Sequence, residues 1–64
     1  MSNTTKIKCT ALDTVCDSLE VCTDNNVVGM VPLSLIIEKF RDDAGCIEAL
    51  IIPTWLAKNR GFIL

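Results

Sequence analysis

The residues best suited to chemistry in this 64-residue chain are its four cysteines. A thiolate can bind a metal, carry a redox reaction or attack a substrate. The thiols follow a C-x6-C-x5-C-x23-C spacing, at Cys9, Cys16, Cys22 and Cys46. Zinc sites made of thiolates and thiol redox motifs use closer pairs, so this spacing favours reduced, packed thiols over a disulfide, metal or redox role.

Other catalytic arrangements lack the residues they need. The chain has no histidine, which excludes Ser-His-Asp triads, Cys-His dyads and histidine metal sites. Asp42 and Asp43 are adjacent, and on a helix their side chains would diverge by about 100°. Asp24-Asn25-Asn26 lacks the ligand spacing of a calcium loop, and the three glycines are too isolated for a phosphate loop. We expect a protein that is not an enzyme and has no cofactor.

Charge is unevenly distributed along the chain. Residues 9–57 have a net charge of -6, whereas Lys6, Lys8, Lys58 and Arg60 bring the whole chain to -2. An acidic face can bind a groove that otherwise holds phosphates, because the groove's cations respond to the field of the anion. The alternative is an ordinary solvated rim. The expected partner-binding residues are the eight acids: Asp13, Asp17, Glu20, Asp24, Glu38, Asp42, Asp43 and Glu48.

Two-residue alternation predicts the elements of the first half of the chain. Residues 6–11 place Ile7 and Cys9 on one face, and residues 17–23 place Leu19 and Val21 on one face. Residues 24–26 predict a turn, because asparagine and aspartate tolerate left-handed backbone angles. A third strand over 27–31 completes a hairpin and ends at Pro32, which cannot donate to a ladder.

The second half predicts two helices around a strand. Residues 34–44 fit an amphipathic helix with Ser34 as N-cap and Gly45 as C-cap, although a strand and turn stay open as alternatives. Residues 46–52 predict a two-sided apolar strand. Residues 54–60 predict a short helix stopped by Gly61, with Trp55 and Leu56 capping the core and residues 62–64 folding back on the sheet. The fold class is α+β: a small antiparallel sheet, or a partly open barrel, in the order strand, strand, strand, helix, strand, helix.

Size and hydropathy indicate one domain over residues 1–64, with residues 1–5 as a flexible N-terminus. Half of the residues are hydrophobic, so the chain should fold. The longest uncharged stretches, 25–37 and 49–57, are shorter than the ~20 residues of a membrane span, so we expect no membrane. With no secretory signal visible, we expect a cytoplasmic protein. Surplus apolar residues predict one of two arrangements: exposed apolar surface, for which a second copy of the chain is a candidate partner, or a second sheet face covered by the two helices.

Two short motifs carry a resemblance to a group of proteins. Val31-Pro32-Leu33-Ser34 and Pro53-Thr54-Trp55-Leu56-Ala57-Lys58-Asn59-Arg60-Gly61 resemble the V-P-x-S and P-x-W-L-A-x-x-x-G motifs of small orphan proteins of bacteriophages and prophages. The chain departs from that pattern at Met30, Leu33 and Thr54. The resemblance implies a mobile-element protein in a bacterial host cell. Such proteins include anti-CRISPR and other anti-defence inhibitors.

Together these observations favour a non-catalytic protein that inhibits a host defence or nucleic-acid-handling complex, with its acidic face as a nucleic-acid mimic. The expected partner is a host protein or ribonucleoprotein complex, and we expect no direct contact with nucleic acid. Two alternatives stay open. One is a small nucleic-acid-binding or phage assembly module that uses the basic ends, and the other is a thiol redox or metal-binding protein.

Overall fold

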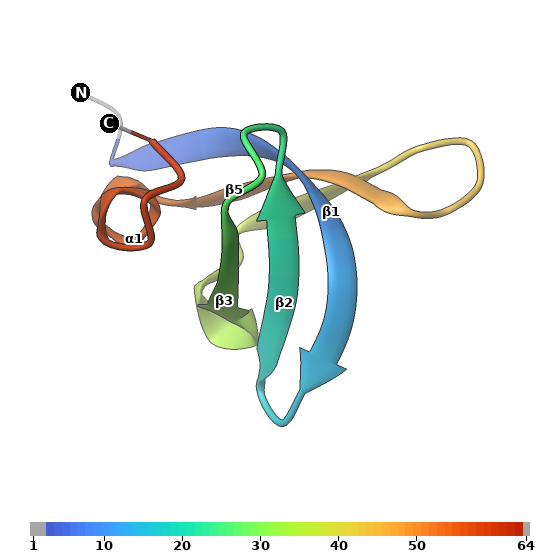
Figure 1. The fold of residues 1–64 in the computed structure, drawn as a ribbon, viewed down its shortest axis with the longest axis horizontal. Helices are drawn as coiled ribbons and strands as arrows, with labels where there is room; N and C mark the ends of the chain where they lie inside the picture. The colour runs from blue at the N-terminus through green and yellow to red at the C-terminus, as the bar shows by residue number, and fades with distance from the viewer. Residues whose placement is uncertain (1–2, 64) are drawn as a thin grey trace.

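The computed structural model describes residues 3–63 and contains one five-stranded antiparallel sheet followed by a short helix (Figure 1). The strand order across the sheet is β3-β2-β1-β5-β4, so β3 and β4 form its two edges. The elements in chain order are β1 Thr4–Val15, β2 Ser18–Thr23, β3 Val28–Pro32, the 3-10 turn η1 Leu33–Leu35, β4 Glu38–Arg41, β5 Ile47–Pro53 and α1 Thr54–Asn59.

Strand β1 belongs to both halves of the sheet. Its first part, residues 4–8, pairs with β5, and its second part, residues 9–15, pairs with β2. A bulge between Ala11 and Asp13 interrupts the second pairing. Bulges bend a strand and increase its twist. In Figure 1, β1 is accordingly a long curved ribbon that runs along both halves of an open sheet.

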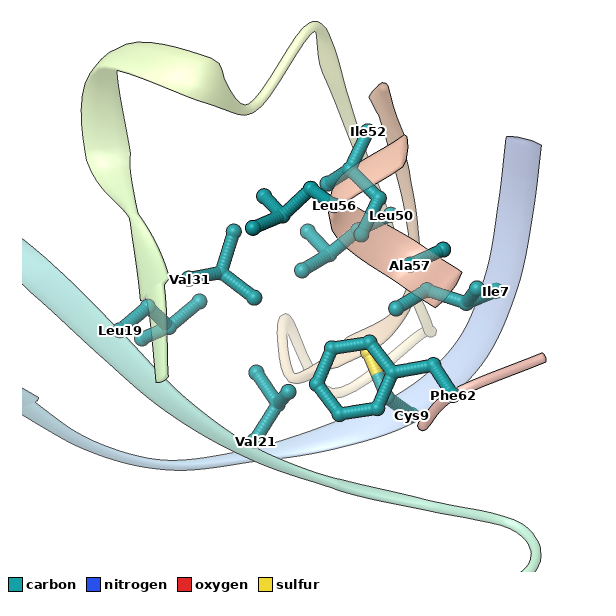
Figure 2. Packing of buried hydrophobic residues seen from close by; sticks show 10 residues of the cluster. All are labelled: Ile7, Cys9, Leu19, Val21, Val31, Leu50, Ile52, Leu56, Ala57 and Phe62. Carbon is teal, nitrogen blue, oxygen red and sulfur yellow. The ribbon is translucent and has the colours of Figure 1, made fainter. Parts of the chain in front are cut away.

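The core lies on the concave side of this bent sheet, under α1. Figure 2 shows side chains from both halves of the sheet meeting those of the helix and the C-terminal segment. Alternation placed Ile7, Cys9, Leu19 and Val21 on the inner face, and all four are buried. The cluster consists of Ile7, Cys9, Leu19, Val21, Val31, Leu50, Ile52, Leu56, Ala57 and Phe62.

The prediction of a helix over residues 34–44 is wrong. These residues form part of η1, strand β4 and a turn. The alternative of a strand and a turn is therefore right in kind, but the strand lies at Glu38–Arg41, where the turn was expected, and not at residues 35–37. Ser34 lies inside the 3-10 turn, and the residue at the N-cap position is Pro32. β4 gains a ladder with β5, and the backbone N–H of Ile37 donates to the carbonyl of Ile51 at 2.8 Å just before it. Gly45 serves this turn with a φ of 83° instead of ending a helix.

Asp42 organises the turn between β4 and β5. Its Oδ1 accepts hydrogen bonds from the backbone N–H groups of Ala44 and Cys46, both at 2.9 Å. A short acidic side chain that satisfies nearby backbone donors stabilises a turn and competes with helix formation. The side chain of Asp42 therefore has a structural role that its charge alone did not indicate.

The short C-terminal helix is confirmed as α1, and Gly61 follows it with a φ of 78°. The backbone N–H of Thr54 donates to the carbonyl of Asn3 at 2.9 Å, which joins the start of α1 to the start of β1 (Figure 1). Phe62 folds back into the core as predicted. Leu64 lies outside the described residues.

The prediction that Trp55 caps the core is wrong, because 61% of this residue is exposed. Leu56 and Ala57 are the helix residues that face the core. Successive residues of a helix point about 100° apart, so a helix packed through Leu56 and Ala57 directs Trp55 outward. Of the two residues expected to cap the core, only Leu56 does so.

Strand β1 begins at Thr4, inside the range expected to be a flexible N-terminus, while residues 1 and 2 lie outside the described part. Residues 3–63 include no helix with the length and apolar character that a membrane crossing requires.

Candidate protein-interaction site

The outer face of the β1–β2 hairpin carries two carboxylates directly across from each other. The strand register places Asp13 opposite Glu20, and Asp17 lies in the turn that joins the strands. Like charges in a cross-strand pair destabilise a sheet. We call Asp13, Asp17 and Glu20 the acidic hairpin.

The backbone fixes the acidic hairpin in place. Asp13 Oδ1 accepts a hydrogen bond from the backbone N–H of Thr14 at 2.8 Å. The carbonyl of Asp17 accepts one from the backbone N–H of Leu33 at 2.7 Å, which joins the hairpin turn to η1. Cys16 adopts a left-handed φ of 54° in the same turn. The carboxylates are therefore presented by a turn that is hydrogen-bonded to a second element.

Exposed apolar side chains accompany these carboxylates. Leu12 is 50% exposed at the bulge of β1, and Val15 is 49% exposed at the end of that strand. A surface that mixes apolar side chains with charges of one sign suits a partner with apolar and oppositely charged groups. The hairpin can thus provide both apolar contact area and negative charge to a protein interface.

The other predicted acids occupy different places. Asp24 in the β2–β3 turn and Glu48 in β5 line a hollow of about 320 Å³ together with Lys6 and Lys8, so their charges have cations beside them. Glu38 begins β4, and Asp42 and Asp43 lie in the β4–β5 turn. The structure therefore gathers three of the eight acids on the hairpin and distributes the remaining five.

The basic residues near the chain ends lie on two elements. Lys6 and Lys8 project from β1, and the Lys6 Nζ lies 4.4 Å from the centre of the Phe40 ring. Arg60 follows α1, and its Nε donates to the carbonyl of Met30 in β3 at 2.9 Å. The Arg60 guanidinium also bonds the side chain of Asn59. Arg60 is therefore held against the protein rather than directed toward solvent.

The four thiols are free and lie in different environments. Cys9 is buried, and this burial, with a smaller effect from the Asp24 carboxylate, raises its thiol pKa to about 11. A thiol with a raised pKa is a poor nucleophile at neutral pH. Cys16 and Cys46 are exposed, so the prediction of packed thiols is wrong for these two. Within residues 3–63, no three Cys, Asp or Glu residues are grouped so that they could hold a metal ion.

Sequence reasoning missed a second surface on the concave side of the sheet. A hollow of about 440 Å³ lies there, and Lys39 and Arg41 of β4 are among its lining residues. The available signal was the pair of cations two residues apart at positions 39 and 41. The helix predicted for residues 34–44 includes both positions and obscured this signal. We call this feature the concave hollow.

Comparison with known proteins found no matching family model, no matching curated protein and no matching solved structure.

Proposed function

We propose that this protein is a non-catalytic interaction protein that binds a cationic protein surface through the acidic hairpin. The observation that carries the proposal is the Asp13–Glu20 cross-strand pair. It places like charges side by side at a cost to folding, on a surface that also exposes Leu12 and Val15. A cationic partner would relieve the repulsion, so binding gives a reason for an arrangement that folding alone disfavours.

A nucleic-acid-binding protein is the partner class with the right chemistry. Such a protein presents lysines and arginines to phosphates, and fixed carboxylates can occupy the same cations. Occupation would block nucleic acid, so the interaction would be inhibitory. The resemblance to small phage proteins extends the proposal to a host defence complex in a bacterial cell, with an anti-CRISPR activity as one form.

Reversal of the acidic hairpin tests the proposal. Immobilised wild-type protein is incubated with nuclease-treated bacterial lysate, washed at low and high salt, and the retained proteins are identified. We expect a nucleic-acid-binding protein that is released by salt or by added duplex DNA, since both compete with an electrostatic contact. The variant D13K/D17K/E20K should not retain it.

The matched control is E38K/D43K/E48K, which makes the same change in net charge at three exposed acids outside the hairpin. This control should retain the partner. Equal retention by the hairpin variant and the wild type would refute the acidic hairpin as the binding surface. Direct retention of nucleic acid from an untreated lysate would instead support a binding module that uses the basic ends.

A further inference from the structure

We propose that the free edge of β4 and the concave hollow beside it bind an extended acidic segment of a partner protein by strand addition. The inference does not depend on the acidic hairpin, because it concerns another face of the molecule and the opposite charge. It rests on a difference between the two edges of the sheet and on the placement of two cations.

The β3 edge is closed by other parts of the chain. The Arg60 guanidinium donates to the carbonyl of Met30, which occupies a backbone acceptor in this strand. The Cβ of Arg60 lies 3.8 Å from the position that a Cβ would take at Gly29, and Phe62 packs on the face of the strand at the same residue. Pro32 ends the strand without an N–H group. Covering groups and proline are devices that stop an edge strand from pairing with another chain.

The β4 edge has no comparable cover within the described part of the chain. Over residues 3–63, no hydrogen bond joins the backbone of Glu38–Arg41 to a segment other than β5. Glu38, Lys39 and Arg41 are exposed, and Phe40 is half-buried. An edge strand in this state offers its outward N–H and C=O groups to a further strand.

Two cations stand on one face of this edge. Lys39 and Arg41 are two residues apart, about 7 Å along the strand, with a shift in the β4–β5 register between Phe40 and Arg41. Both line the concave hollow. The Arg41 Nη1 donates to the carbonyl of Gly45 at 3.0 Å, which fixes the direction of the guanidinium. A guanidinium has five N–H donors, so most of them remain for a carboxylate.

The concave hollow complements an extended segment. Its lining contains no acidic residue, and its apolar part consists of Ala11, Leu19, Leu33 and Ile47. A strand added to β4 would direct every second side chain toward this face. Two carboxylates at alternate positions, about 7 Å apart on this face, would reach Lys39 and Arg41. An apolar side chain two residues further along the segment would reach the apolar lining.

Charge also argues against a second copy of β4 as the occupant. Two copies of an edge strand related by a two-fold axis pair antiparallel, and residues directly opposite each other then lie on the same face of the sheet. On the concave face, Lys39 would lie opposite its own counterpart or Arg41. Like charges directly opposite are destabilising. The geometry therefore points to a partner segment whose inward side chains are acidic.

Short peptides can test this strand addition. The probe is an acetylated and amidated peptide of sequence ETETL, and the control is KTKTL. Binding to isotope-labelled protein is followed by amide chemical shifts at 0.15 M salt. We expect ETETL, but not KTKTL, to shift the amides of β4 and of the concave hollow. ETETL with N-methyl groups at alternate residues should lose binding, because it cannot donate to the ladder.

Charge variants complete the test. K39E/R41E should weaken ETETL binding about tenfold, because it replaces two attractive contacts with repulsion. K8E/K58E changes the net charge equally on β1 and α1 and should leave the affinity within about twofold, since screening limits distant charges. Unchanged affinity in K39E/R41E, or undiminished binding of the N-methylated peptide, would overturn the proposal. So would β4 shifts that grow with protein concentration without peptide, because they would place a second copy on the edge.

Discussion

At the scale of single residues, Trp55 and Leu56 allow a direct comparison, because they are neighbours in α1 but one is exposed and the other is buried. Leu56 is fully buried, and 61% of Trp55 is exposed. We expect Leu56→Ala to lower the free energy of unfolding by about 2–5 kcal/mol and Trp55→Ala by less than about 1 kcal/mol. Urea denaturation followed by circular dichroism measures both values. A loss above 2 kcal/mol for Trp55→Ala would place this side chain in the core after all.

The buried thiol of Cys9 leads to a prediction of how the free energy of unfolding changes at alkaline pH. Its pKa rises from an ordinary value of 9.0 to about 11 in the folded protein. Between these values the unfolded chain loses the thiol proton while the folded chain keeps it. The Cys9 contribution to stability is therefore complete below pH 9 and decreases by up to about 1.4 kcal/mol per pH unit toward pH 11.

Denaturation at pH 8 and pH 10.5 with a reductant present checks this effect in the wild type and in Cys9→Ala. The wild type should lose more stability between the two pH values, since the two proteins differ only at position 9. An equal loss in both would contradict the expected shift.

At the scale of elements, strands were predictable where alternation placed one face against a core. Residues 6–11 and 17–23 have this pattern; the first range lies in β1, and the second forms β2 from Ser18 onward. Residues 34–44 do not, because the spacing of Leu33, Ile36, Ile37 and Phe40 is that of a helix. Pairing between β4 and β5 decides between the two structures, and that contact is tertiary. Local pattern alone therefore could not identify β4 or its edge.

The contact between β3 and the C-terminal segment gives a prediction for these two elements. A Cβ at position 29 would lie 2.9 Å from Phe62 Cζ, in a strand where φ favours ordinary residues. We expect Gly29→Ala to cost about 1–3 kcal/mol through overpacking. In Gly29→Ala/Phe62→Leu the cost should be smaller than the sum of the single variants, because the shorter side chain makes room. Additive costs in urea denaturation would show that Phe62 and Gly29 are not coupled.

At the scale of the whole molecule, the register between distant strands determines which charged side chains lie next to each other. The acidic residues were visible in the sequence, but the opposition of Asp13 and Glu20 depends on the bulge in β1, which shifts the register by one residue. Pairing of residues 4–8 with β5 joins segments that are more than forty positions apart. Composition predicted an acidic surface, whereas the division into an acidic hairpin and a basic concave hollow required the assembled sheet.

The same assembly predicts that both halves of the sheet unfold together. Strand β1 pairs with β2 in one half and with β5 in the other, and one core receives side chains from both halves (Figure 2). Val31 in β3 and Ile52 in β5 are both fully buried in that core. We expect Val31→Ala to lower stability by about 1–3 kcal/mol and Ile52→Val by about 1 kcal/mol.

Native-state hydrogen exchange separates a shared transition from two independent ones. For either variant, the slowest amides of β2 and of β5 should lose protection by the same free energy, because a single cooperative unit exposes both. A loss confined to β2 and β3 in Val31→Ala, or to β4 and β5 in Ile52→Val, would mean that β1 acts as a hinge between two units. The β4 edge and the acidic hairpin could then move independently, whereas a shared transition holds both binding surfaces on one rigid sheet.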